Sequence, residues 1–261
     1  MSLFEGILLG LVQGLTEFIP VSSSGHLIVI HHFFGVAKED LAIDAVLQLA
    51  TVLAVFLYFR SDVWNLLVTF IKLISGKSVE ARDRNVLFAI ILGTIPAVVL
   101  GLVLESYMES FFRSTTLVAL TLILGSVLMY HADTADVKAE ILTPQKGLVI
   151  GFFQSLALIP GISRSGSTIS GGLLSGLQRE EATRFSFLLS FPIILGSGLK
   201  KLFDLSVAHE AVSFPLGVSF IVSFLTGLVC IHFLIKYLRS HSLRVFIWYR
   251  VVLAVLLLIL L

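Results

Sequence analysis

Two short clusters of polar side chains could carry chemistry in this chain, and they repeat each other. Residues 22–26 read Ser-Ser-Ser-Gly-His, and residues 163–166 read Ser-Arg-Ser-Gly. Each cluster follows a proline, Pro20 or Pro160, and a segment in which two glycines spaced by four lead to a glutamine. The repetition predicts a duplicated unit that consists of a helix, a break at the proline, and a turn whose hydroxyls can cap a second helix.

The first cluster combines hydroxyl groups with a group that can move a proton. A helix that begins near Ser23 would present free N–H groups, which bind anions. His26 can gain or lose a proton near neutral pH. Helix capping alone would account for one serine, whereas three serines followed by a histidine exceed what a cap needs. This cluster therefore indicates a site rather than a simple helix start.

The second cluster adds a permanent positive charge. Arg164 offers a planar fork of donors that matches phosphate, and the neighbouring hydroxyls and N–H groups would complete the cradle. The alternative is an ion pair between Arg164 and Glu17 that joins the two repeats, and such a pair could also be the resting state of the same site. Together with a serine nucleophile and a histidine acid or base, the pattern predicts phosphoryl transfer.

A carboxylate and an amide extend this site toward the preceding helix. Gln13 and Glu17 are four residues apart, so they share one helix face, together with Gly6 and Gly10. A glutamate at membrane depth is costly and usually functional. The two glycines have a simpler interpretation, which we favour: small residues at this spacing let two helices approach closely.

The composition places the chain in a membrane. Hydrophobic residues make up 57% of the 261 residues and charged residues 13%, with a mean hydropathy of +1.01, which is typical of an integral membrane protein. The net charge of +1 gives no reason to expect nucleic acid as a partner. The single cysteine, Cys230, excludes an internal disulfide and a cysteine metal cluster. The first residues lack the basic start of a removable signal peptide.

Six apolar runs approach the roughly 20 residues that a membrane-spanning helix needs. They are 42–59, 85–105, 116–132, 180–200, 214–238 and 244–261. The apolar segments 1–19 and 144–159 each end at a proline and a turn, which predicts two re-entrant hairpins. Residues 63–74 place apolar side chains at helical spacing and favour an interfacial helix, the alternative being a seventh crossing.

The distribution of cations predicts the orientation. Most lysines and arginines follow the first, third and fifth runs, so this side is expected to be cytoplasmic and both termini are expected on the outer side. Three crossings separate the hairpins, which would then enter from opposite faces. We therefore expect an all-α polytopic protein with one membrane domain, built from inverted-topology repeats of about 1–132 and 144–261 whose turns meet. Farther along, Glu180 and Arg184 are spaced for an ion pair within one helix.

Three motifs in this order resemble one known family. The segment from Gln13 to Glu17 is similar to the family's [E/Q]xxxE motif, and residues 23–26 stand at its serine-glycine-histidine segment. Residues 160–168 are similar to its PGxSRSxxT motif. The family is that of the bacterial undecaprenyl-diphosphate phosphatases of the bacitracin-resistance type, and the resemblance extends over essentially the whole chain.

The resemblance implies hydrolysis of a C55 polyprenyl diphosphate to the monophosphate carrier used in peptidoglycan synthesis, in the bacterial cytoplasmic membrane. It also implies dependence on a divalent cation, Mg²⁺ or Ca²⁺, bacitracin resistance on overproduction, and a fold of inverted repeats with re-entrant hairpins. Gln13 stands where the motif also allows glutamate, so this site has one carboxylate fewer. A polyprenyl-phosphate transporter or flippase is the alternative, since inverted repeats also build transporters. A homodimer is a further possibility that the sequence leaves open.

The expected site residues fall into three groups. The catalytic group is Ser23, His26, Arg164 and Glu17, with His26 or an activated water as the alternatives to Ser23 as nucleophile. The substrate-binding group is Gln13, Ser22, Ser24, Gly25, Ser163, Ser165, Gly166 and Thr168. The expected metal ligands are Glu17 and Gln13.

Overall fold

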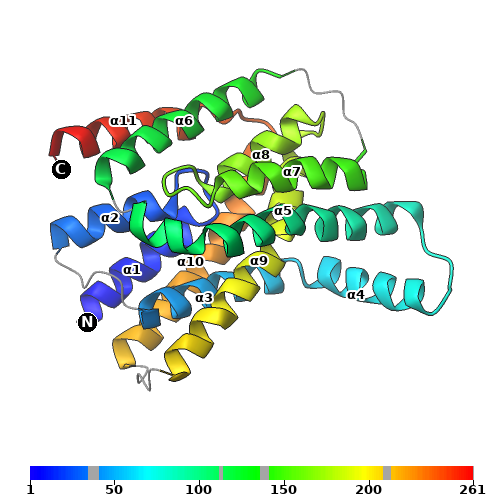
Figure 1. Ribbon diagram of the computed structural model, residues 1–261, viewed down its shortest axis with the longest axis horizontal. Helices are drawn as coiled ribbons and strands as arrows, with labels where there is room; N and C mark the ends of the chain where they lie inside the picture. The colour runs from blue at the N-terminus through cyan, green and yellow to red at the C-terminus, as the bar shows by residue number, and fades with distance from the viewer. Residues whose placement is uncertain (35–40, 112–113, 136–140, 208–212, 261) are drawn as a thin grey trace.

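The computed structural model describes residues 1–34, 41–111, 114–135, 141–207 and 213–260, and within these ranges the chain forms eleven helices and no strand. The expected all-α class is therefore confirmed. The helices are α1 (Leu3–Thr16), α2 (Ser23–Phe34), α3 (Leu41–Tyr58), α4 (Arg60–Ile74), α5 (Ala81–Phe111), α6 (Thr115–Asp133), α7 (Pro144–Leu156), α8 (Arg164–Leu174), α9 (Arg179–Val207), α10 (Phe214–Leu238) and α11 (Arg244–Leu260) (Figure 1).

Four helices in the described residues are long and apolar enough to cross a membrane, namely α5, α6, α9 and α10. Each contains one of the predicted apolar runs, and α10 coincides with the run 214–238. The number rises to five if α3 and α4, which meet at a bend of 79°, are taken as one broken span. The sixth predicted run forms α11, whose 17 residues lie at the lower end of the length of a spanning helix. The described residues thus support a multi-pass membrane protein with four or five candidate spans, against the six expected runs.

The helix expected at 63–74 forms as α4, separated from α3 by the 79° bend. Its apolar side chains remain largely exposed, and Trp64 and Ile74 are exposed by 66% and 70%. Figure 1 shows α4 projecting beside the start of α5, away from the other helices. Two apolar helices that meet at such a bend form a broken span or a re-entrant loop, so the interfacial position of α4 stays a prediction.

The short helices of the two hairpins pack on helices from the opposite half of the chain. α1 lies along α10, and α7 lies along α5, while α3 packs on α9 and α6 on α11 (Figure 1). The glycines make the first two contacts close: a Cβ atom on Gly10 would lie 2.6 Å from the Ser219 carbonyl oxygen, and one on Gly151 would overlap the backbone of Gly93. The favoured interpretation of the glycine spacing, close helix approach, is therefore confirmed.

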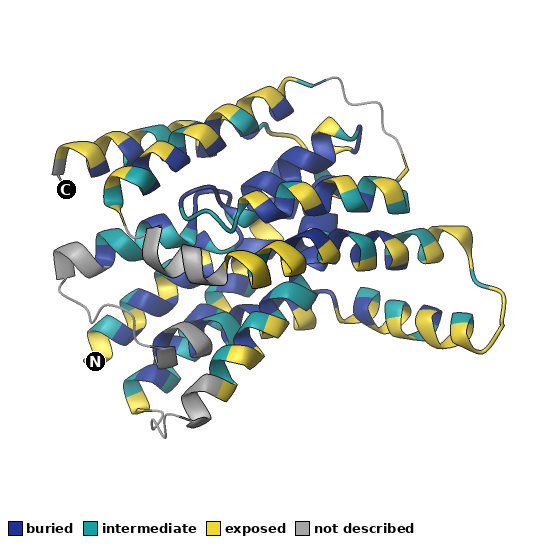
Figure 2. Cartoon of the chain, viewed as in Figure 1, coloured by how far each residue is buried: buried dark blue, intermediate teal, exposed yellow. Residues whose placement is uncertain are grey.

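The interior of the bundle holds the ends of the hairpins in place. Phe18, directly after Glu17, is fully buried and packs edge-to-face on Phe187 of α9 at 5.5 Å between ring centroids. Figure 2 shows buried residues concentrated in α8 and in the turns beside it. The polar clusters thus lie inside the protein, where a low dielectric strengthens their interactions.

Candidate active site

The first turn holds Ser22 in a left-handed backbone conformation, with φ at +75°. This conformation is unfavourable for a residue with a side chain, and here the Ser22 hydroxyl compensates locally. Its Oγ lies 3.0 Å from Ser24 Oγ and accepts a hydrogen bond from the Gly25 N–H at 3.4 Å. The serine therefore fixes the turn and begins α2.

The second turn repeats this geometry at Ser163, with φ at +64°. Its Oγ lies 3.3 Å from Ser165 Oγ and accepts from the Gly166 N–H at 3.2 Å. The sequence repeat between residues 22–25 and 163–166 is thus also a repeat of conformation and hydrogen bonding. The hydroxyls of Ser22 and Ser163 are used within their own turns.

The two turns lie against each other in the middle of the molecule (Figure 1). The Gly161 N–H of the second turn donates to Ser24 Oγ of the first at 3.2 Å. The carbonyl oxygen of Pro160 accepts from Thr121 on α6 at 2.5 Å. The expected meeting of the turns is therefore present in the structure.

Glu17 is the centre of the polar cluster between the turns. Its Oε2 accepts from the Gln13 amide and from the Ser23 hydroxyl, both at 3.1 Å, and its Oε1 accepts from Arg164 Nη2 at 3.0 Å. The Glu17 and Arg164 side chains are only 14% and 13% exposed. The structure thus joins four of the expected site residues, and it shows the ion pair that was the alternative interpretation of Arg164.

A cavity of about 180 Å³ opens beside this cluster. The residues that line it are Gln13, Glu17, Ser23, Ser24, Leu27, Leu47 and Gln48. Its wall combines the carboxylate, amide and hydroxyl groups of the first hairpin with apolar side chains from α2 and α3. A polar reacting group and an apolar chain could therefore approach the same place.

Arg164 retains unused capacity to bind an anion. Its Nη1 is buried, and no hydrogen-bond partner is found for it among the described residues. A buried guanidinium nitrogen without a partner is costly, because it has lost its water without replacing it. An anion beside Arg164 would supply the missing acceptor.

Two of the expected substrate-binding residues lie behind this cluster. Ser165 and Thr168 are fully buried, and the Thr168 hydroxyl lies 2.8 Å from the Arg164 carbonyl oxygen and 2.5 Å from Ser186 Oγ on α9. Because Thr168 follows Arg164 by one helical turn, its hydroxyl returns to the helix backbone. It braces α8 against α9, and its expected contact with substrate stays a prediction.

His26 does not line the cavity. Its Nδ1 lies 2.7 Å from the Ser22 carbonyl oxygen, and its Nε2 lies 2.6 Å from the hydroxyl of Tyr249 on α11. The hydrogen bond of Ser23 goes to Glu17 instead. The ring is therefore drawn back against its own turn and toward α11, away from the hydroxyl that it was expected to serve.

Arg250 is a site residue that the sequence analysis missed. Its side chain is fully buried; Nε donates to Ser126 Oγ at 3.1 Å, and Nη2 donates to the carbonyl oxygens of Leu122 and Gly161 at 3.1 and 3.0 Å. It thereby ties α11 and α6 to the second turn. An arginine in the apolar run 244–261 was the available signal, because a charge within such a run rarely lacks a function.

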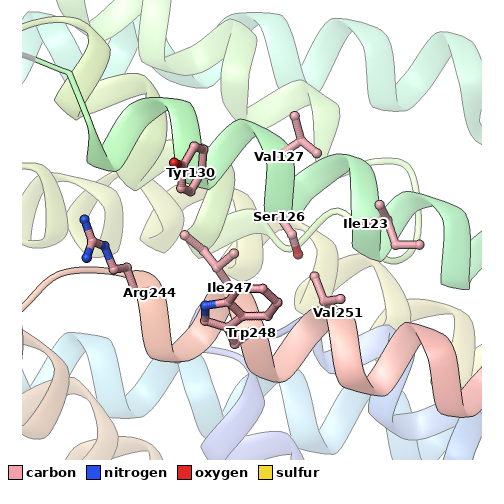
Figure 3. A pocket seen from close by; sticks show the side chains of 8 residues that line it. All are labelled: Ile123, Ser126, Val127, Tyr130, Arg244, Ile247, Trp248 and Val251. Carbon is pink, nitrogen blue, oxygen red and sulfur yellow. The ribbon is translucent and has the colours of Figure 1, made fainter.

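A larger cavity, of about 490 Å³, lies between α6 and α11 (Figure 3). Its lining is mainly apolar, with Arg244 and Tyr130 toward one end and Ser126 between the helices. It contains no carboxylate or histidine. Size alone would select this cavity, but the groups that could perform phosphoryl transfer line the smaller one.

The side-chain oxygens near Glu17 can bind a divalent cation only if a bound phosphate-containing ligand supplies the remaining oxygen ligands. The described residues contain no group of three histidine, cysteine or acidic side chains that could hold a metal ion. Glu17 and the amide oxygen of Gln13 are oxygen ligands, and Mg²⁺ is commonly bound by one or two carboxylates plus substrate phosphates. The residues therefore fit a divalent cation bound jointly with a phosphate-containing ligand.

The fold and the site define a class: a multi-pass helical membrane protein in which two similar turns build a buried polar cluster. The chain belongs to the family described as bacitracin resistance protein BacA, whose family model matches residues 6–256. It is 42% identical to an undecaprenyl-diphosphatase of Thermobifida fusca (strain YX), over 99% of this chain and 90% of that protein. It is 41% identical to an undecaprenyl-diphosphatase of Hahella chejuensis (strain KCTC 2396), over 97% and 96% of the two chains.

Proposed function

We propose that this protein is an enzyme that hydrolyses undecaprenyl diphosphate to undecaprenyl phosphate and inorganic phosphate, and so recycles the lipid carrier for cell-wall synthesis. The names of its relatives support the substrate. The observation that carries the proposal is the cluster of Arg164, Glu17 and Ser23, in which a nucleophile, a base and an unsatisfied guanidinium nitrogen lie together. The same similarity supports bacitracin resistance on overproduction.

The first step is binding of the diphosphate between the two turns. Its oxygens compete with Glu17 for Arg164, whose fork holds phosphate and stabilises the charge that grows during transfer. The apolar wall beside Leu27 and Leu47 suits the start of the prenyl chain. Displacing Arg164 from Glu17 converts the resting ion pair into the active arrangement.

The second step is attack by Ser23. Its Oγ forms a bond to the terminal phosphorus and its proton passes to Glu17 Oε2, while the bond from that phosphorus to the bridging oxygen breaks and undecaprenyl phosphate leaves with the proton from Glu17. Water then attacks the phosphoserine and gives a proton to the ionised Glu17; the bond from phosphorus to Ser23 Oγ breaks, and Glu17 returns the proton to Ser23 as inorganic phosphate leaves. The hydrogen bond of 3.1 Å from Ser23 to Glu17 supports this choice of base.

A divalent cation, Mg²⁺ or Ca²⁺, fits this scheme as a partner of the bound diphosphate. Glu17 and Gln13 would hold it together with phosphate oxygens, and it would supply positive charge against the negative charge of the transferred group. Within the protein, Gln13 keeps the Glu17 carboxylate oriented through its amide.

The direct test measures phosphate release from undecaprenyl diphosphate by purified protein in detergent. We expect release by the wild type, a loss of at least about 100-fold in Ser23→Ala because the nucleophile is gone, and a loss on chelation that Mg²⁺ or Ca²⁺ restores. Ser240→Ala, which removes an exposed hydroxyl in the turn after α10, is the matched control. A folded wild type that binds the lipid without releasing phosphate would contradict the enzyme and favour a flippase; release that is insensitive to chelation would contradict the cation.

We further propose that both termini lie on the outer side of the membrane. In Figure 1 the start of α1 and the end of α11 lie at one side, and the connection between α4 and α5 lies at the other. In a Cys230→Ser background, Ser2→Cys is expected to react with a membrane-impermeant thiol reagent added to intact cells, whereas Lys77→Cys is expected to react only after lysis. If Lys77→Cys but not Ser2→Cys were labelled in intact cells, the protein would have the opposite orientation.

A further inference from the structure

His26 is held by hydrogen bonds on both sides of its ring. Nδ1 lies 2.7 Å from the Ser22 carbonyl oxygen, and Nε2 lies 2.6 Å from the Tyr249 hydroxyl. The rings of His26 and Tyr249 are parallel within 1°, with centroids 5.5 Å apart. Two segments from opposite ends of the chain thus fix one imidazole in position and in plane.

These partners determine which nitrogen of His26 can exchange a proton. A carbonyl oxygen only accepts hydrogen bonds, so Nδ1 carries a hydrogen that it donates to Ser22. In the neutral ring Nε2 is then the acceptor, and the Tyr249 hydroxyl donates to it. When Nε2 gains a proton, the direction of this bond reverses, because a phenol oxygen can also accept. Tyr249 therefore contacts the one nitrogen of His26 that titrates.

The position of Tyr249 is itself fixed from the site. Its neighbour Arg250 is fully buried and binds the Gly161 carbonyl oxygen of the second turn at 3.0 Å. This contact ties α11 to the second turn, while Tyr249 extends from the same helix to the first. Burial does not account for the tyrosine, which is 47% exposed; the two rings lie in parallel planes, and the hydroxyl makes the contact of 2.6 Å with His26.

We propose that Tyr249 is a positioning residue for the phosphatase reaction: its hydroxyl holds His26 in the tautomer and orientation in which Nδ1 donates to the Ser22 carbonyl oxygen, and so fixes the turn that presents Ser23 to Glu17. The inference rests on the proposed function and adds to it the residue that holds the first turn in place through His26.

The test is a double-mutant cycle with steady-state phosphate release. Tyr249→Phe keeps the aromatic ring and removes only the hydroxyl, so we expect kcat to fall about 10-fold with KM unchanged, less than the roughly 100-fold that a misplacement of about 1 Å at the reacting groups can cost. In His26→Ala, kcat should fall further than in Tyr249→Phe. The double variant should be no slower than His26→Ala alone, because Tyr249 acts through the imidazole that is already missing.

Tyr58→Phe is the matched control, since the Tyr58 hydroxyl lies 3.2 Å from Nδ1 of His232 on α10, outside the site. It should leave kcat and KM at wild-type values. Thermal unfolding in detergent checks that all variants are folded. Losses that multiply in the double variant, a Tyr249→Phe rate equal to wild type, or an effect on KM alone would each overturn the inference. A wild type that releases no phosphate would instead overturn the proposed function.

Discussion

Replacing Arg164 with alanine is expected to lower phosphate release at least about 100-fold, the loss typical when one preorganised donor to a developing charge is removed. Arg164 holds Glu17 at 3.0 Å in the resting site and has a second, buried nitrogen without a partner. Alanine would remove both the phosphate fork and the charge that balances Glu17. The measurement is the initial rate of release at saturating and at limiting undecaprenyl diphosphate.

Two further variants separate charge from geometry. Arg164→Lys keeps the positive charge but lacks the planar fork, so its rate should lie between those of wild type and Arg164→Ala. Arg239→Ala removes an arginine that pairs with Glu180 and is 59% exposed, and it should retain wild-type activity. If thermal unfolding shows that Arg164→Ala is folded and its rate still equals that of the wild type, the phosphate-binding role of this arginine is contradicted.

The fold follows from the sequence wherever a local pattern is sufficient. The runs 116–132 and 214–238 predict α6 and α10 to within one residue, because hydropathy along a single helix determines them. The repeated serine pattern also predicts two equivalent turns. Hydropathy does not determine how many helices cross the membrane: α11 is apolar but short, and α3 ends at a 79° bend that no proline or glycine marks.

The sequence predicts site residues that belong to one motif, but it does not predict contacts between residues that are far apart in the sequence and meet only when the helices pack. Spacing suggested an ion pair between Glu180 and Arg184, but Arg184 binds Asp62 at 3.1 Å, and Glu180 binds Arg239. Each of these charges meets a closer partner on a neighbouring helix than on its own. The sequence did not indicate Tyr249 for the same reason, because only the packing of α11 brings its hydroxyl to His26.

Replacing Gly161 with alanine is expected to abolish activity and to destabilise the protein by more than about 2 kcal/mol, the combined cost of backbone strain and overpacking. Its φ is +95°, a conformation that residues with a side chain rarely adopt. A Cβ atom there would also overlap the Thr121 hydroxyl and lie 2.7 Å from the Val118 carbonyl oxygen. Thermal unfolding in detergent and phosphate release would measure the two effects.

Gly161 has this importance because its two peptide groups bind residues of two different helices. Its N–H binds Ser24 of the first turn, and its carbonyl oxygen binds Arg250 of α11, so a displaced second turn would lose both contacts and move Arg164 away from Glu17. Gly217→Ala is the matched control, since a Cβ there meets nothing within 4 Å and alanine favours the helix. It should leave activity intact. Equal behaviour of the two variants would show that the turn tolerates a side chain, and that the contacts between the repeats do not hold the active arrangement.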